Sequence, residues 1–132
     1  MDDKPLVVVL SSPPYTINSV DGMLTVLGVA PKLGWKISIF LIDEGVHLAE
    51  KGQRPLEGVY VRTAGSHGVP FHEVNFEKAL QRLLDEKVRI YACEDSCKEH
   101  CLTPSDLIDG VTMATYKELA EEVLLTKAVF FF

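Results

Sequence analysis

Continuous apolar runs recur along the chain at intervals that suit the strands of a sheet. Residues 6–10 are all Leu or Val, which is typical of a strand buried on both faces of a parallel sheet. Residues 36–42 and 88–92 form two more strand-like runs. Shorter extended stretches occur at residues 111–113 and 128–132. The pattern therefore predicts five strands.

Apolar residues at helical spacing separate these predicted strands. They fall within residues 18–34, 75–84 and 115–124. A helix start at Thr103-Pro104 and a stop at Gly110 predict a further helix over residues 103–110. Each of these segments begins with a residue whose side chain can cap the first turn of a helix. These caps are Asn18, Asn75, Thr103 and Thr115. Gly34 and Gly110 mark the ends of the first and third helices, and residues 43–52 form a further short segment.

Alternating strands and helices with short connections predict an α/β fold, a three-layer α/β/α sandwich around a mainly parallel five-stranded sheet. We expect one domain over residues 1–132, because this length suffices for one core but not for two. Residues 53–72 lack periodicity and are expected to form a long loop, either functional or mobile. The active site of such a sheet lies beyond the carboxyl ends of its strands. Residues 11–15, 43–46 and those from 93 onward meet that description.

The composition narrows the class of partner and the compartment. A net charge of −6 argues against a nucleic-acid or anionic-membrane surface, since both need clustered cations. No apolar run is long enough to span a membrane, and the acidic start does not resemble a signal peptide. The three cysteines lie within residues 93–101, which favours reduced thiols over a secreted disulfide framework. We therefore expect a soluble cytoplasmic protein.

Cys93 follows directly on the third long apolar run and is the main candidate for chemistry. A sulfur at the end of a buried strand, before a segment that can be helical, lies near free backbone amides that favour a thiolate nucleophile. Glu94 and Asp95 oppose this, because negative charge disfavours a thiolate unless Lys98 or His100 compensates. The alternative is a buried structural cysteine.

Cys97 and Cys101 follow Cys93 at steps of four residues. If residues 94–101 are helical, the three sulfurs share one face, which permits sulfur relay. The spacing is not a familiar zinc or iron–sulfur pattern and lacks a clear fourth ligand, so we expect no metal. Cys97 and Cys101 are either auxiliary resolving thiols or inert.

Other polar residues are weaker candidates for a functional site than Cys93. The turn that contains Ser12 and Pro13 has neither glycine nor lysine, so it cannot be a phosphate-binding loop of the usual kind. Asp43 and Glu44 can act as acid and base, although acidic residues at a helix start more often satisfy its amides. His47, His67 and His72 can each deliver a proton near a thiolate, or are simply solvated. Nothing here requires a cofactor.

Several short motifs together resemble a known family. They are Ser12-Pro13-Pro14-Tyr15, Phe40-Leu41-Ile42-Asp43-Glu44-Gly45-Val46, Tyr91-Ala92-Cys93, Leu107-Ile108-Asp109-Gly110-Val111 and the stretch 119–132. Their order and spacing are similar to those of the DsrE-like proteins, which include the DsrE and TusD sulfur-relay subunits. The resemblance spans nearly the whole chain.

The resemblance implies an α/β/α sandwich that assembles into homo-oligomers, trimers or hexamers. It also implies a sulfur-relay protein, a possible sulfurtransferase, that holds a persulfide on Cys93 and needs no cofactor. The partners would be sulfur donor and acceptor proteins or small persulfides, with no nucleic acid or membrane. The pocket candidates are Ser12, Pro13, Tyr15, Asp43, Gly45 and His67. The alternatives are a non-catalytic assembly or protein-binding subunit, since some relatives lack the cysteine, and a thiol redox or metal sensor.

Overall fold

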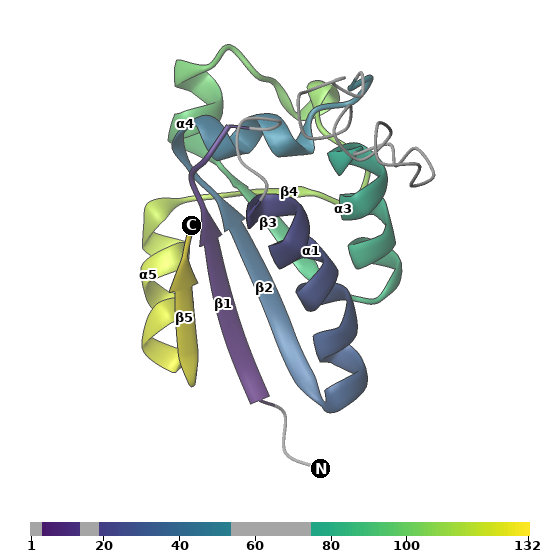
Figure 1. Ribbon diagram of the computed structural model, residues 1–132. Coiled ribbons are helices and arrows are strands. Elements are labelled where there is room, and N and C mark those ends of the chain that lie inside the picture. The colour runs from purple at the N-terminus through teal and green to yellow at the C-terminus, as the bar shows by residue number, and fades with distance from the viewer. Residues whose placement is uncertain (1–3, 14–18, 54–74) are drawn as a thin grey trace, which may run out of the picture.

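A parallel sheet of five strands forms the centre of the protein (Figure 1). The computed structural model describes residues 4–13, 19–53 and 75–132. The strands are β1 (Lys4–Leu10), β2 (Trp35–Leu41), β3 (Arg89–Cys93), β4 (Thr112–Ala114) and β5 (Ala128–Phe131). They lie in the order β4-β3-β2-β1-β5, and every neighbouring pair is parallel. The predicted parallel sheet of five strands is confirmed.

Helices cover both faces of this sheet. Helices α1 (Ser19–Val29) and α3 (Phe76–Asp85) pack on one face, and α5 (Tyr116–Leu125) packs on the other (Figure 1). The short helix α4 (Glu94–Glu99) and the 3-10 segment η2 (Asp43–Ala49) follow the carboxyl ends of β3 and β2. Two further 3-10 segments are η1 (Ala30–Leu33) and η3 (Pro104–Asp106). The three-layer α/β/α sandwich is confirmed.

Strand β1 shows why the continuous apolar run predicted a central strand. Val8 and Leu10 belong to the core beneath α1 and α3, whereas Val7 and Val9 belong to the smaller core beneath α5. All four are almost completely buried. Each such side chain stabilises the fold by about 1.5–3 kcal/mol relative to an exposed position, so the strand cannot tolerate polar residues on either face.

The predicted helix caps form where the structure describes them. The Asn75 side chain accepts a hydrogen bond of 3.0 Å from the N–H of Lys78. At the start of α5, Thr115 accepts from the N–H of Glu118, whose carboxylate accepts in return from the N–H of Thr115. The predicted cap Asn18 and residues 54–72 of the predicted loop lie outside the described residues.

The predicted helix over residues 103–110 is wrong in its length. Thr103 and Asp106 form the expected cap, but only the single turn η3 follows. Leu107 then takes an extended conformation and forms an antiparallel bridge with Glu50, and the N–H of Ile108 donates to the carbonyl of Ala49. Burial of Leu107 and Ile108 in the core favours this pairing over a second helical turn. In the described part of the chain, no helix is long and apolar enough to cross a bilayer.

Candidate active site

Cys93 is the last residue of β3 and also the N-cap residue of α4. Its backbone is extended, with φ −62° and ψ 123°, and its side chain forms no capping hydrogen bond to α4. The residue is only 4 % exposed. The structure thus places the sulfur at the carboxyl edge of the sheet, as expected, but the amides of the following helix do not hold it.

Tyr116 is brought to Cys93 by the order of the strands. Ala114, the last residue of β4, pairs in register with Cys93. Tyr116 begins α5 two residues later, at the same edge of the sheet. The two side chains interact, because Cys93 contributes to the raised pKa of the Tyr116 hydroxyl.

Ser96 and Asp43 extend this contact into a chain of hydrogen bonds. The N–H of Asp43 donates to Oγ of Ser96 over 2.9 Å. The same Oγ lies 3.5 Å from the Tyr116 hydroxyl, and a serine that accepts from Asp43 still has its own proton to donate. The hydrogen bonds therefore connect Asp43 through Ser96 to Tyr116, and Tyr116 in turn interacts with Cys93. This chain joins η2, α4 and α5 to the end of β3.

The Tyr116 hydroxyl keeps its proton in this setting. The hydrogen bond with Ser96 acts to lower the pKa of Tyr116, because it supplies a donor to the phenolate. The hydrogen bond to Cys93, burial, and the charges of Cys93 and Asp43 act in the opposite direction and outweigh it, so the pKa of Tyr116 is raised above its ordinary value. Tyr116 is therefore a hydrogen-bond donor to the sulfur at neutral pH.

Cys97 lies one helical turn after Cys93 and is completely buried. Burial raises the pKa of its thiol from 9.0 to about 11, and the neighbouring charge of Cys93 contributes in the same direction. A thiol with such a pKa is almost entirely protonated at neutral pH, and only a thiolate attacks sulfur readily. The structure therefore favours Cys97 as an inert core residue over Cys97 as a second nucleophile.

The prediction that three sulfurs share one helical face does not hold. Helix α4 ends at Glu99, and Cys101 has φ +58°, which takes the chain out of the helical path. Cys101 is exposed, whereas Cys93 and Cys97 are buried. A role for Cys101 as an auxiliary thiol stays a prediction.

The negative charges of Glu94 and Asp95, which follow Cys93, are partly offset. Nζ of Lys98 lies 3.7 Å from Oε1 of Glu94, one turn earlier on α4. Asp95 is exposed to solvent, which screens its charge from the buried sulfur. Of the two cations that the sequence offered, Lys98 and His100, it is Lys98 that pairs with Glu94 and offsets its charge.

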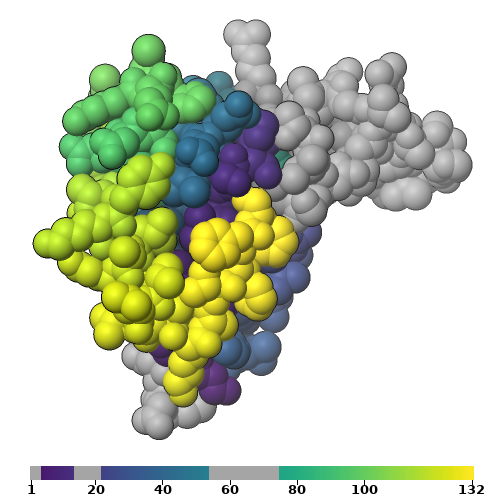
Figure 2. Space-filling model, turned by 90° about the vertical axis from the view of Figure 1, so that its left-hand side faces the viewer, coloured from purple at the N-terminus to yellow at the C-terminus, as the bar shows by residue number. Residues whose placement is uncertain are grey.

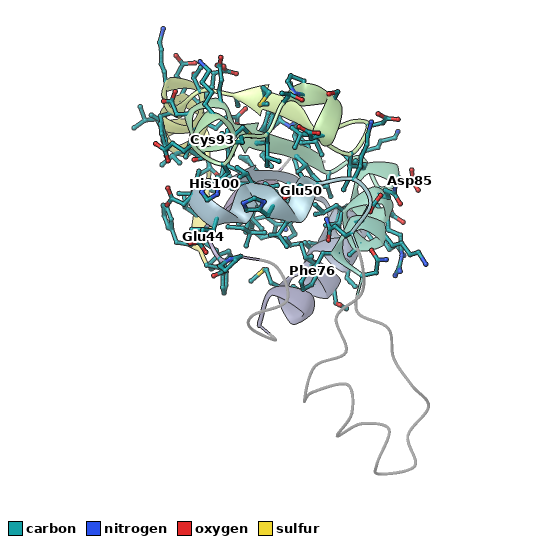
Figure 3. The ribbon with its side chains drawn as sticks, turned by 90° about the horizontal axis from the view of Figure 1, so that it is seen from above. Glu44, Glu50, Phe76, Asp85, Cys93 and His100 are labelled. Carbon is teal, nitrogen blue, oxygen red and sulfur yellow. The ribbon has the colours of Figure 1, made fainter. Side chains whose placement is uncertain are left out.

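His47 and His100 form a second connection between η2 and α4. Nε2 of His47 lies 2.9 Å from Nδ1 of His100, and Nδ1 of His47 contacts the carboxylate of Glu50. Figure 3 looks down on this edge and shows Cys93, His100 and Glu50 gathered over it. The segment η2 is therefore tied to α4 at two points, at Ser96 and at His100.

The remaining predicted pocket residues lie apart from Cys93 or serve the fold. Ser12 and Pro13 follow β1, which is separated from β3 by β2, so they lie about 10 Å away across the sheet. A Cβ on Gly45 would come within 2.1 Å of the Leu10 carbonyl oxygen, so this glycine permits close packing of η2 on β1. Tyr15 and His67 lie outside the described residues.

Sequence reasoning missed Tyr116 and Ser96. Tyr116 directly follows the Thr115 cap, and a residue just beyond a predicted strand belongs to the functional edge of a parallel sheet. That rule identifies Tyr116 once 111–113 is accepted as a strand. No three His, Cys, Asp or Glu side chains in the described ranges are placed to hold a metal ion.

The fold and the site together define an α/β protein with a cysteine at the carboxyl edge of a parallel sheet. The chain belongs to the DsrE/DsrF-like family, whose model matches residues 4–132. It is 31 % identical over 127 residues to the uncharacterised protein MK0008 of Methanopyrus kandleri, covering 96 % of this chain and 93 % of that one. It is 28 % identical over 112 residues to the uncharacterised protein MJ0989 of Methanocaldococcus jannaschii, covering 85 % of each.

Solved structures show the same fold. The ychN protein from E. coli superimposes with a TM-score of 0.80 at 24 % identity, over 98 % of this chain and 99 % of that one. MTH1491 from Methanobacterium thermoautotrophicum, a protein of unknown function, superimposes with a TM-score of 0.58 at 12 % identity, over 96 % and 97 %. At these identities the similarity establishes the architecture alone.

Proposed function

We propose that this protein carries sulfane sulfur as a persulfide on Cys93. The observation that carries the proposal is the placement of Tyr116 beside Cys93 at the carboxyl edge of the sheet, where β4 pairs with β3 up to Cys93 and the two side chains interact. A tyrosine that keeps its proton stabilises negative charge on the sulfur it faces. Membership of the DsrE/DsrF-like family supports sulfur relay as the class of function.

The transfer step needs no external oxidant or reductant. The Cys93 thiolate attacks the terminal sulfur of a donor persulfide, R–S–SH. A bond forms between Cys93 Sγ and that sulfur, the S–S bond of the donor breaks, and R–S⁻ leaves with the electron pair. An acceptor thiolate then attacks the terminal sulfur of the Cys93 persulfide and releases Cys93 as a thiolate. Donor and acceptor are proteins or small persulfides and thiols.

Tyr116 has two roles in this proposal. Its hydroxyl donates a hydrogen bond to the Cys93 sulfur when that sulfur attacks the donor as a thiolate. It donates again when Cys93 is released as a thiolate. Tyr116 is also 45 % exposed, whereas Cys93 is 4 % exposed, so a donor reaches the sulfur only after neighbouring side chains move. A cytoplasmic setting suits this function, because the carrier thiol must stay reduced.

Mass spectrometry of the intact protein tests the proposal. The wild type, incubated with glutathione persulfide, should gain the mass of one sulfur atom, and a later addition of excess thiol should remove it. Cys93→Ala should gain none, whereas Cys97→Ala and Cys101→Ala should behave like the wild type. An adduct that persists in Cys93→Ala, or no adduct on the wild type, would refute persulfide transfer by Cys93.

The burial of Cys93 favours a second candidate, a non-catalytic subunit that binds protein partners. In that case the 4 % exposure describes an ordinary core cysteine. The two candidates differ in the rate at which native Cys93 reacts with a small thiol probe. A rate well above that of global unfolding supports the carrier, and complete protection until global unfolding supports the second candidate.

We also propose that the protein forms a homo-oligomer through the face made by α5 and β5. Large apolar side chains are exposed there, among them Leu124 at 85 % and Phe131 at 69 %, together with Leu125 and Phe130. Figure 2 shows this face of the molecule, with α5 in yellow-green and β5 in yellow. Strand β5 is at the edge of the sheet, so its outer backbone groups are open to a further strand. A second copy of the chain, with the same apolar face, is the proposed occupant.

Sedimentation velocity tests the oligomer. The wild type should sediment as a trimer or hexamer, and Leu124→Lys should shift it toward the monomer. Val26→Lys is the matched control, since Val26 is an exposed apolar residue on α1, on the opposite face of the sheet. A monomeric wild type, or equal effects of both substitutions, would exclude this interface.

A further inference from the structure

A pocket of about 360 Å³ lies at the amino-terminal end of β3, at the other end of the strand from Cys93. It exists because β4 is short. Strand β4 pairs with β3 only from Tyr91 to Cys93, so within the described residues no strand lies beside Arg89 on that side. Gly110, with φ +101°, turns the chain against Leu84 and closes the rim of the pocket.

The lining of this pocket is cationic in an acidic protein. Lys87 and Arg89 both line it, and no Asp or Glu does, although the whole chain has a net charge of −6. The other lining side chains are apolar, such as Leu84, or carry a hydroxyl, such as Thr112. A concave surface with two cations beside apolar groups suits an anion that has a small apolar part.

Arg89 has a donor without an acceptor here. Its Nη1 lies 3.6 Å from Oε1 of Glu122, which is a long ion pair. Its Nε is buried and has no hydrogen-bond partner among the described residues. A buried donor without a partner is costly, so a ligand acceptor that reached Nε would relieve this cost. Nε and the two Nη atoms together form the planar guanidinium, whose donors match the geometry of an oxyanion.

Lys87 occupies its place at a conformational cost. Its φ of +67° follows the end of α3, at a position where glycine is the favoured residue. A lysine therefore stands where glycine would suit the backbone better, and this lysine lines the pocket.

We propose that this pocket binds a small organic oxyanion, with its carboxylate or phosphate group at Lys87 and Arg89 and a short aliphatic group beside Leu84. The site is independent of sulfur transfer. Four residue steps of an extended strand separate Arg89 from Cys93, or about 13 Å. The ligand would lie against the amino end of β3 rather than in contact with the sulfur.

Titrations of the ¹⁵N-labelled full-length protein, followed by ¹H–¹⁵N NMR at constant ionic strength, test the proposal. The probes are isobutyrate, acetate and inorganic phosphate. We expect saturable shifts confined to residues 84–91 and 110–112. Isobutyrate should bind more tightly than acetate if the aliphatic group contributes, and the phosphate titration shows which headgroup is preferred.

Two variants separate binding from folding. Lys87→Gly should unfold at the same temperature as the wild type or higher, because glycine suits its φ, yet it should bind roughly tenfold or more weakly through loss of a charged donor. Arg89→Gln should weaken binding by a similar factor. Lys78→Gln, which removes a charge from the exposed face of α3, should leave binding unchanged. Absence of saturable shifts in the wild type, or equal binding by Lys87→Gly, would overturn the proposal.

Discussion

Nε2 of His47 lies 2.9 Å from Nδ1 of His100, and the two rings meet edge to face with their centroids 4.7 Å apart. The other ring nitrogen of His47 contacts the carboxylate of Glu50. An ionised carboxylate can only accept, so Nδ1 of His47 must donate. With neutral rings, Nε2 of His47 then accepts and Nδ1 of His100 donates.

This directional chain predicts the tautomers of both residues. Long-range ¹H–¹⁵N spectra at neutral pH should show His47 and His100 each protonated at Nδ1. Substitution of Glu50 by Gln should relax the preference of His47, because the amide side chain can also donate. A wild-type His47 protonated at Nε2 would show that the chain is not formed in solution.

The same pair predicts a contribution to stability. His100→Ala removes one of the two connections between η2 and α4, and we expect the free energy of unfolding to fall by about 1 kcal/mol. Urea denaturation measures this. Glu99→Ala serves as the control, because Glu99 is the exposed neighbour of His100, and an equal loss of stability in both variants would argue against a specific role for the pair.

Removal of the Tyr116 hydroxyl should slow chemistry at Cys93. In Tyr116→Phe the sulfur loses its hydrogen-bond donor, and we expect alkylation of Cys93 by iodoacetamide at neutral pH to slow by several fold to about tenfold. Peptide mass spectrometry at successive times gives the rate at each cysteine. Tyr91→Phe is the matched control, because the Tyr91 ring stacks on Phe40 in the core that faces α5. An unchanged rate in Tyr116→Phe would remove Tyr116 from the site.

Burial of Cys97 predicts a loss of stability in alkali. The native state holds the Cys97 proton more tightly than the unfolded chain does, because the pKa of the thiol is about 11 in the fold and 9.0 outside it. The resulting stabilisation is complete below pH 9 and is lost as the pH rises to about 11. It amounts to at most about 3 kcal/mol.

Urea denaturation of matched variants isolates this effect from other groups that titrate in alkali. Cys97→Ala should flatten the decline in the free energy of unfolding between pH 9 and about 11, whereas the exposed Cys101→Ala should leave the decline as it is. Parallel curves for all three proteins would show that Cys97 does not titrate as its burial implies.

Substitution of Gly45 and of Gly22 by alanine should change the stability of the protein in opposite directions. Gly45→Ala places a Cβ within 2.1 Å of the Leu10 carbonyl oxygen, which forces η2 away from β1, and we expect a loss of about 3 kcal/mol or more. Gly22→Ala in α1 meets nothing within 4 Å and should gain up to about 1 kcal/mol from helix propensity. Thermal unfolding of both variants checks this, and a stable Gly45→Ala would contradict the close approach.

Local contacts account for what could be predicted from the pattern of residues. The caps at Asn75 and Thr115 each join groups three residues apart, so they can be predicted from a short stretch of sequence. The continuous apolar run of β1 likewise requires burial on both faces whatever its neighbours are. The position of Cys93 at the strand end follows from the same kind of evidence.

Distant contacts account for what could not be predicted. The helix expected after Thr103 stops after one turn because Leu107 pairs with Glu50, a partner that no local pattern reveals. Cys97 and Cys101 look equivalent by spacing, yet one is buried and the other exposed. The difference arises because α4 packs on η2 and ends at Glu99, before the third cysteine.

The amino-acid sequence by itself determined the strands, most of the helices, their caps and the cysteine at the end of β3, because these depend on periodicity and on contacts within one turn. The tertiary structure alone decided which groups surround that cysteine. Tyr116 reaches Cys93 only because β4 lies beside β3 in the sheet. Lys87 and Arg89 line an open pocket at the other end of β3 only because β4 is too short to cover that end. Such neighbours are set by the packing of the whole core, which no local pattern encodes.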